Sequence, residues 1–185
     1  MLPEISLNIL DVAQNAMRAK ATKVEIRLEA DTELDLLQIW IQDNGYGMTS
    51  KQMEQVTDPF FTTRTTRKVG LGIPFFREAA LATGGKFDME STLGKGTVVH
   101  ATFILSHIDR MPLGNMVDTM YTLILMHQKV EFIYTYCVDK RSFVLDTNDF
   151  KEILGEVPFE TPEVSNYIKD FLKINMEEVN GNIVL

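Results

Sequence analysis

The segment LNILDVAQNAMRAKA, from Leu7 to Ala21, has the hydrophobic spacing of an amphipathic helix. Its apolar side chains, with one just before the segment, repeat as a buried helical face: Ile5, Ile9, Val12, Ala13 and Ala16. A line of polar side chains repeats at the same helical spacing: Asn8, Asp11, Asn15 and Arg18. Asn and Asp are poor helix formers because they compete for backbone hydrogen bonds. This line is therefore not an ordinary solvent face, and its four residues are candidates for function.

The composition is that of a globular protein with a substantial core. The chain has 185 residues, 45% apolar and 24% charged, which fits one domain or one domain with an extension. The single cysteine, Cys137, rules out an internal disulfide framework and suits a reducing compartment. The net charge of −8 argues against nonspecific binding to nucleic acid or an anionic membrane. The start, MLPEIS, does not resemble a signal peptide, and no apolar run reaches membrane-spanning length, so we expect a cytoplasmic protein.

The first part of the chain mixes strand and helix patterns. Short runs of alternating apolar and polar residues predict strands at 22–31, 34–45, 86–92 and 96–105. A helix is predicted at 71–85, with Pro74 in its first turn and Gly84 and Gly85 at its end. Residues 49–69 are polar and threonine-rich without a usable period, and we expect a loop there. The combination predicts an α+β protein built as a two-layer α/β sandwich.

The sequence from Ser106 onward contains a second set of elements. It predicts a helix at 112–128 and a hairpin at 130–146 that turns at 139–141. A short helix follows, capped by Thr147 or Asn148 and ending at Gly155. The last predicted helix is at 160–179, with Thr161 as its cap and Pro162 as its first residue. We therefore expect domains at 1–105 and 106–185, the second a small α+β extension. Its amphipathic elements could cover the sheet, dimerise or dock a partner, and we predict a partner or dimer surface.

The motif IQDNGYGM, at residues 41–48, follows the second predicted strand. Asp-Asn-Gly is a common turn sequence, and that interpretation needs no ligand. An Asp at the end of a buried strand, here Asp43, can also accept a hydrogen bond from an amino group such as that of adenine. Neighbouring glycines, here Gly45 and Gly47, would let the backbone close on a flat ring. Both interpretations remain open at this point.

The stretch VGLGIPF, at residues 69–75, places two glycines just before a predicted helix. Such a sequence is either merely flexible or exposes backbone N–H groups and the helix dipole to an anion. It lacks the third glycine and the leading strand of a Rossmann fingerprint, and LGKGT at 93–97 has Gly where a Walker A loop needs Ser or Thr. The cations Arg64, Arg67 and Lys68 nearby form either a solvated face or the positive side of a phosphate site.

In this order, the motifs resemble those of the GHKL ATPase superfamily, which includes gyrase-type topoisomerases, heat-shock chaperones, histidine kinases and mismatch-repair ATPases. The first helix with Asn15 resembles the N box, DNGYG the first glycine box, DPFFTTR at 58–64 the phenylalanine box, GLG the second glycine box and GKGT the last Gly-Thr box. The resemblance covers roughly residues 3–105 and implies the Bergerat ATP-binding fold, a mixed sheet covered by helices. It extends to histidine kinase catalytic domains and anti-sigma-type proteins. Through NAMRA and the short predicted loop at 49–69, which would form the lid over the nucleotide, it also extends to mitochondrial dehydrogenase kinases.

The resemblance implies a role for each motif in binding ATP with Mg²⁺. Asn15 would coordinate Mg²⁺, for which an amide oxygen is a suitable hard ligand. Asp11 takes the position of the general base, where many members carry the longer Glu, and Asp43 would bind the adenine amino group. The other nucleotide-binding residues that it implies are Asn8, Arg18, Gly45, Gly47, Met48, Phe60, Thr63, Arg64, Lys68, Gly70, Leu71, Gly72, Gly96 and Thr97. Of these, Gly70 and Gly72 would present N–H groups to phosphates, and Arg64 or Lys68 would neutralise the γ-phosphate.

Two functions follow from the resemblance. The first is a stand-alone protein kinase that transfers the γ-phosphate to a Ser, Thr or His of a partner protein. The alternative is a slow ATPase or an ATP-gated switch, which the short Asp11 side chain favours because a general base must reach its proton. A purely structural scaffold would require all five boxes to be relics. We expect ATP and a protein partner, with a homodimer as an option, and neither a membrane nor nucleic acid. His100, His107 and His127 lack a phosphoacceptor context, and we expect Cys137 to be in the core.

Overall fold

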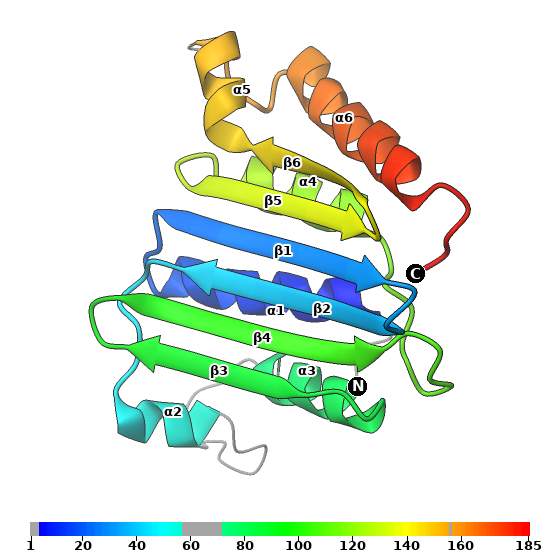
Figure 1. Ribbon diagram of the computed structural model, residues 1–185. Helices are drawn as coiled ribbons and strands as arrows, with labels where there is room; N and C mark the ends of the chain where they lie inside the picture. Colours follow the sequence, from blue (N-terminus) through cyan, green and yellow to red (C-terminus); the bar gives the residue numbers. More distant parts are fainter. Residues whose placement is uncertain (1–3, 57–71, 156) are drawn as a thin grey trace.

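The computed structural model describes residues 4–56, 72–155 and 157–185, and within them one mixed sheet runs through the molecule. The sheet has six strands in the order β3-β4-β2-β1-β5-β6 (Figure 1). Their bounds are β1 Lys23–Asp31, β2 Leu36–Asp43, β3 Phe87–Thr92, β4 Gly96–Ile104, β5 Glu131–Val138 and β6 Arg141–Asp146. All neighbouring pairs are antiparallel except β1 and β5, which are parallel.

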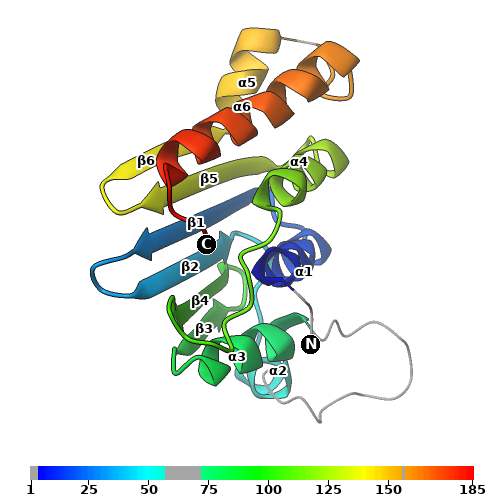
Figure 2. The ribbon, with the colours of Figure 1, turned by 90° about the vertical axis from the view of Figure 1, so that its right-hand side faces the viewer.

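Helices cover one face of this sheet. Figures 1 and 2 show α1 (Ile5–Arg18), α3 (Gly72–Ala82) and α4 (Met116–Met126) lying side by side against it. The remaining helices are α2 (Ser50–Val56), α5 (Thr147–Leu154) and α6 (Pro162–Asn180), of which α6 packs on β5, β6 and α4. The predicted class, an α+β protein with a two-layer sandwich, is confirmed. Among the residues that the structure describes, no helix has the length and apolarity needed to cross a membrane.

The core lies between α1 and the central strands. In β1 every second side chain is buried, with Val24, Ile26 and Leu28 at 1% exposure or less. They pack in the same cluster as Ile5 and Ile9, which are fully buried on α1. Each such side chain contributes about 1.5–3 kcal/mol to folding by leaving water. The buried face of α1 thus fixes its rotation, and with it the direction of the polar line on the same helix.

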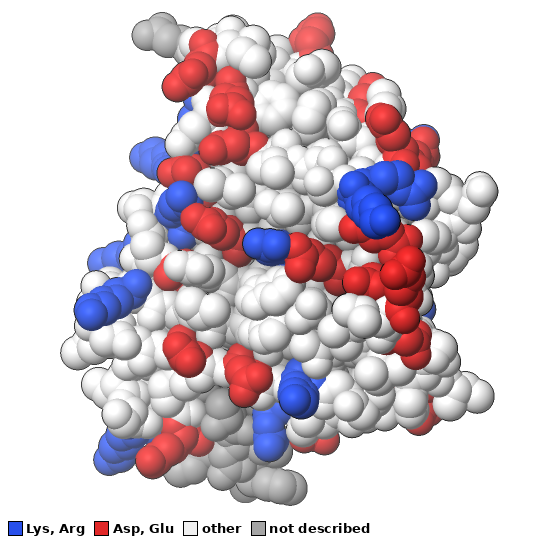
Figure 3. All heavy atoms as spheres, in the orientation of Figure 1, with Lys and Arg blue, Asp and Glu red and all other residues white. Residues whose placement is uncertain are grey.

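The opposite face of the sheet is open along the central strands, where the described helices leave it uncovered (Figure 3). Strand β1 places Lys23, Glu25, Arg27 and Glu29 there in alternation with its buried residues. The Arg27 guanidinium lies over the Trp40 ring, 5.4 Å from its centroid. Trp40 in turn stacks on His100, with ring centroids 4.5 Å apart. Along β1 this face carries charged side chains, and among the described residues it contributes none to the cavity described below.

The part of the chain after Ser106 continues the same sheet. Strand β5 pairs in parallel with β1, from Lys23 opposite Glu131 to Ala30 opposite Val138. Helix α4 packs against α1, and Tyr134 is fully buried in the common core. The predicted hairpin and helices of this part are present. The division into domains at 1–105 and 106–185 stays a prediction.

Three local predictions are wrong. Residues 50–56 form α2 inside the predicted loop 49–69, because Thr49 and Gln52 cap this helix reciprocally. Asp146, rather than Thr147 or Asn148, caps α5, since its side chain accepts a hydrogen bond from the Asn148 N–H. Cys137 is partly exposed rather than in the core, because strand alternation turns it away from the helices.

Candidate functional site

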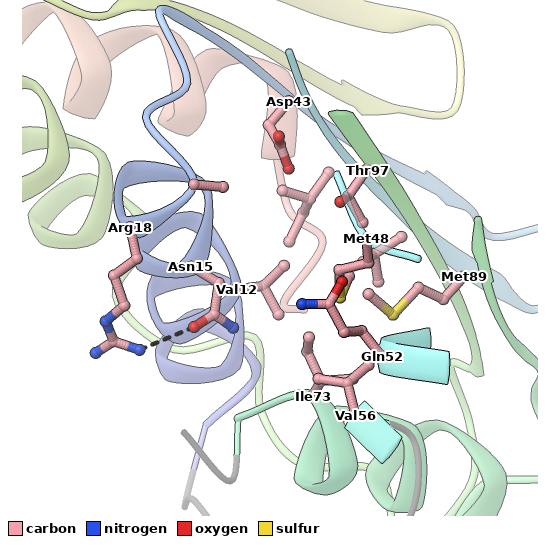
Figure 4. A pocket seen from close by; sticks show the side chains of 13 residues that line it. Val12, Asn15, Arg18, Asp43, Met48, Gln52, Val56, Ile73, Met89 and Thr97 are labelled. Atoms are coloured by element: carbon pink, nitrogen blue, oxygen red, sulfur yellow. Dashed lines mark hydrogen bonds between the residues drawn. The ribbon is translucent and has the colours of Figure 1, made fainter. Parts of the chain in front are cut away.

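A cavity of about 420 Å³ opens between α1, α2, the start of α3 and the ends of β2, β3 and β4 (Figure 4). Five of its lining residues were predicted to bind the nucleotide: Asn15, Arg18, Asp43, Met48 and Thr97. The others are mainly apolar: Val12, Ala19, Ile41, Gln52, Val56, Ile73, Met89 and Val99. The structure therefore brings three of the separate sequence motifs to one apolar cavity with a few polar groups, which is the usual make-up of a small-molecule site.

Asp43 ends strand β2 at one side of this cavity. Its Oδ1 accepts a hydrogen bond from the Gly45 N–H at 2.8 Å. Burial raises the pKa of the Asp43 carboxyl, and the N–H groups of Gly45 and Thr97 oppose that rise. The carboxyl is thus fixed in place within an apolar wall, where a ligand that donates hydrogen bonds would satisfy it.

The loop from Asn44 to Met48 is held from two sides. On the α1 side, Asn44 Oδ1 accepts from the N–H groups of Thr22 and Lys23 at 2.8 and 2.9 Å, and the Tyr46 N–H donates to Ala19 O at 2.9 Å. On the other side, a Cβ at Gly47 would lie 2.0 Å from Thr92 O, and Gly47 has a φ of +66°. The loop is therefore preorganised beside the cavity, and the motif requires glycine at this position for steric reasons.

The polar residues along α1 do not all lie at the cavity. Asn15 and Arg18 line the cavity, and Arg18 Nη1 donates to Asn15 Oδ1 at 2.9 Å (Figure 4). Asp11 lies one turn earlier against the first turn of α3, where a Cβ added at Gly72 would be 2.6 Å from the Asp11 Cβ. Burial raises the pKa of Asp11, and the charge of Arg18 opposes this.

Asn8 lies apart from these residues. It is fully buried, its Nδ2 donates to Glu4 O at 3.2 Å, and its Oδ1 has no partner among the described residues. It is not among the residues that line the cavity within the described ranges. The beginning of α1 is covered here because the N–H groups of Ile5 and Ser6 donate to Pro112 O and Leu113 O. The nucleotide contact expected for Asn8 stays a prediction.

Gly96, in the last Gly-Thr motif, lets the start of β4 approach the end of β2 closely. A Cβ at Gly96, whose φ is +102°, would lie 1.9 Å from Asp43 O. This close approach pairs Asp43 with Thr97 across β2 and β4 and brings both side chains to the cavity. The other predicted residues, Phe60, Thr63, Arg64, Lys68, Gly70 and Leu71, lie outside the described residues, as does Arg67.

Gln52 is a lining residue that the sequence reasoning missed. It projects from α2 toward the cavity (Figure 4), and its Oε1 accepts from the Thr49 N–H at 2.9 Å. The signal that could have found it is the sequence TSKQ, a capping box that predicts a helix start at residue 49. The apolar lining residues Met89 and Val99 were read only as strand residues.

Comparisons with known proteins identify the family of residues 3–107. The family model described as "Histidine kinase-, DNA gyrase B-, and HSP90-like ATPase" matches residues 3–107. Among curated proteins, the chain is 33% identical over 106 residues to the sensor protein kinase FleS of Pseudomonas aeruginosa, covering 57% of this chain and 26% of that protein. It is 32% identical over 107 residues to the sensor histidine kinase WalK of Bacillus subtilis, covering 54% and 17%.

A solved structure shows the same fold. The Aquifex aeolicus MutL ATPase domain complexed with ADP superposes with a TM-score of 0.54 at 17% identity, covering 83% of this chain and 68% of that one. The chain spans only a small part of the length of its curated relatives, 16% for a putative sensor protein of Shewanella frigidimarina that is 32% identical over 109 residues, or 58% of this chain. The family match, the motifs and the cavity that they form lead to one conclusion: the chain belongs to the histidine kinase-, DNA gyrase B- and HSP90-like (GHKL) ATPase family, with an ATP-binding domain of the histidine kinase type.

Proposed function

We propose that the chain binds ATP with Mg²⁺ in this cavity and transfers the γ-phosphate to a Ser, Thr or His of a partner protein. The observation that carries the proposal is the cavity that brings Asp43, Thr97, Asn15 and Arg18 together. Its apolar walls suit a flat base, and apart from Gln52 its polar side chains lie at two places, Asp43 with Thr97 and Asn15 with Arg18. A base and a phosphate chain need this division of apolar and polar surface.

Each end of the cavity would hold a different part of the nucleotide. Asp43 accepts hydrogen bonds and suits an exocyclic amine, and Ile41 and Val99 suit the faces of the base. At the other end, the Arg18 guanidinium and the backbone at the start of α3 would bind phosphate oxygens.

The residues present also fit a magnesium ion. Asn15 lines the cavity, and its Oδ1 accepts one hydrogen bond, from Arg18, which leaves a second lone pair for a metal ion. Mg²⁺ is usually held by one or two protein oxygens together with phosphate oxygens and water. Asn15 would hold the ion, which would neutralise phosphate charge during transfer.

Asp11 decides between a kinase and the alternative functions. It lies beside the first turn of α3, and burial raises the pKa of its carboxyl, which suits a proton acceptor. Sensor kinases among the relatives favour phosphate transfer, although the chain matches only part of each. The shorter reach of Asp relative to Glu favours the second candidate, a slow ATPase or ATP-gated switch.

Labelled ATP distinguishes these functions. Protein is incubated with Mg²⁺ and γ-labelled ATP, with and without soluble cell extract, and both free phosphate and protein-bound label are measured. A kinase labels an extract protein in the wild type but not in Asn15→Ala, and acid treatment separates phosphohistidine from phosphoserine and phosphothreonine. Steady phosphate release without extract indicates an ATPase. Binding of ATP with neither result indicates a switch, and it contradicts the kinase.

Residues 106–185 stay our candidate for partner or dimer contacts. Helices α5 and α6 expose large apolar side chains, with Ile153 82%, Tyr167 57% and Ile174 61% exposed. A homodimer is the alternative to a partner protein, and light scattering of the purified chain decides between them. We also propose a cytoplasmic location, which a fluorescent fusion tests.

A further inference from the structure

Ser91 joins the two segments that form the base end of the cavity. It lies on β3, and its Oγ accepts a hydrogen bond from the Met48 N–H at 2.8 Å. The same Oγ donates to Gly96 O at 3.0 Å and lies 2.9 Å from Thr97 Oγ1. One hydroxyl thus connects the Asn44–Met48 loop with the start of β4. Ser91 itself does not line the cavity within the described residues.

The hydrogen of each hydroxyl can be assigned by counting. A serine hydroxyl has one hydrogen and two lone pairs. Since the Gly96 carbonyl can only accept, the Ser91 hydrogen goes to Gly96 O. The short contact between Ser91 and Thr97 is then a hydrogen bond that the Thr97 hydroxyl donates. This arrangement satisfies all three contacts of Ser91, and it directs the Thr97 hydrogen toward Ser91.

The consequence is a pair of acceptors at the base end. Thr97 lines the cavity beside Asp43 (Figure 4), and with its hydrogen used by Ser91 its Oγ1 offers only lone pairs. The Asp43 carboxylate also accepts. A 6-amino purine can offer two hydrogens, both on N6, to such a pair, whereas a 6-oxo purine offers one, on N1, and has an acceptor at the 6-position. A buried acceptor without a donor loses affinity by roughly tenfold to a hundredfold.

We infer that Ser91 is a positioning residue that holds the Thr97 hydroxyl as an acceptor, and that it thereby selects 6-amino over 6-oxo purine nucleotides. The inference rests on the proposed nucleotide binding, and it adds the origin of base selection to it. Ser91 acts through Thr97 and touches no ligand itself. A purely structural role, in which Ser91 only ties the turn to the loop, would affect all purine nucleotides equally.

The test compares the affinities of adenosine diphosphate and inosine diphosphate, which differ in this way at the 6-position and at N1. Calorimetry measures both on the wild type, Ser91→Ala and Ser91→Thr, with Glu90→Ala, exposed on the opposite face of the same strand, as control. We expect the wild type and the control to prefer the adenine nucleotide by roughly tenfold to a hundredfold. Ser91→Ala reduces this ratio by about tenfold, since the freed Thr97 hydroxyl can turn and donate to the 6-oxo group. Ser91→Thr keeps its hydroxyl and restores the ratio.

Each other result has a distinct meaning. If Ser91→Ala weakens both nucleotides by the same factor, the ratio is unchanged and the inference is overturned while the proposed function stands. If the wild type binds neither nucleotide, the proposed function fails, and the inference fails with it. Should Ser91→Ala not fold, Ser91→Cys keeps the side-chain volume with a weaker donor and is judged by the same ratio.

Discussion

Replacing Asp43 by Asn separates the binding role of this residue from its effect on stability. Asp43 is the charged acceptor at the base end of the cavity, and hydrogen bonds to charged groups contribute about 1.5–3 kcal/mol. Losing this contact weakens ATP binding by about tenfold to 150-fold, at about 1.4 kcal/mol for each factor of ten. The amide introduced by Asp43→Asn keeps an oxygen that can accept from the Gly45 N–H, so the loop keeps its anchor.

The stability of the unliganded protein should change in the opposite direction. Burial raises the pKa of Asp43 above its ordinary value of 3.8, so the folded state binds this proton more tightly than the unfolded state. Between 3.8 and the raised pKa, the free energy of unfolding therefore falls as pH rises. Above that range the wild type carries a penalty of about 1.4 kcal/mol for each unit by which the pKa is raised, and Asp43→Asn lacks it.

The assay combines ATP calorimetry with denaturant unfolding at neutral pH and at about pH 3, below the ordinary pKa, where the penalty is nearly gone. We expect Asp43→Asn to bind ATP weakly, to unfold at the same or higher denaturant concentration at neutral pH, and to lose that advantage in acid. Gln42→Ala, at the exposed neighbouring position of β2, is the control and should change neither property. The reasoning is refuted if Asp43→Asn binds ATP as tightly as the wild type, or if it is less stable at neutral pH.

Three further substitutions, one of them with a control variant, test the fold around the cavity and the shared core. Gly96→Ala should lower the free energy of unfolding in urea by at least about 2 kcal/mol and abolish ATP binding, because the added Cβ meets Asp43 O. Its control is Gly94→Ala, also at positive φ but with open space among the described residues, which should lower it by about 1 kcal/mol. Equal losses for the two would contradict the steric argument. Tyr136→Phe removes a 2.6 Å contact to Asn180 Oδ1 and should cost about 1 kcal/mol at neutral pH. Burial raises the pKa of Tyr136 to about 12, so wild-type stability falls as pH rises above the ordinary value of 10.0, and unfolding curves of the variant should show a smaller alkaline loss. Phe132→Ala, at a fully buried position of β5, should cost about 3–5 kcal/mol in the same assay, and a loss under about 1 kcal/mol would mean that β5 is not part of the main core.

Much of the fold was predictable because its elements have strong local patterns. The periodicity of α1 and the alternation in β1 and β2 gave these elements to within a few residues. The parallel pairing of β5 with β1 was not predictable in this way, since it joins strands far apart in the chain and no local signal encodes it. Helix α2 was missed because its seven residues are too few for a period, and its start depends on the reciprocal cap between Thr49 and Gln52.

The site residues that could be predicted from the sequence are those within recognisable motifs. Asp43, Asn15 and Thr97 were named from the sequence, and the cavity contains all three. Asn8 lies on the same helical face as Asn15, but the segment around Leu113 covers the beginning of α1, where Asn8 is buried. Helical spacing alone cannot predict such a contact with a distant segment. Ser91 was not singled out because its importance lies in three hydrogen bonds that exist only once β3, β4 and the Asn44–Met48 loop are assembled.

The most direct test of the central claim, that this cavity holds ATP with Mg²⁺ on Asn15, is calorimetric titration of ATP with and without Mg²⁺. It is carried out on the wild type and on Asn15→Ala, with thermal unfolding to establish that both are folded. The account predicts that Mg²⁺ strengthens ATP binding to the wild type and that this dependence on the metal is lost in Asn15→Ala. A wild type that binds no ATP, or a dependence on Mg²⁺ that survives in Asn15→Ala, would contradict it.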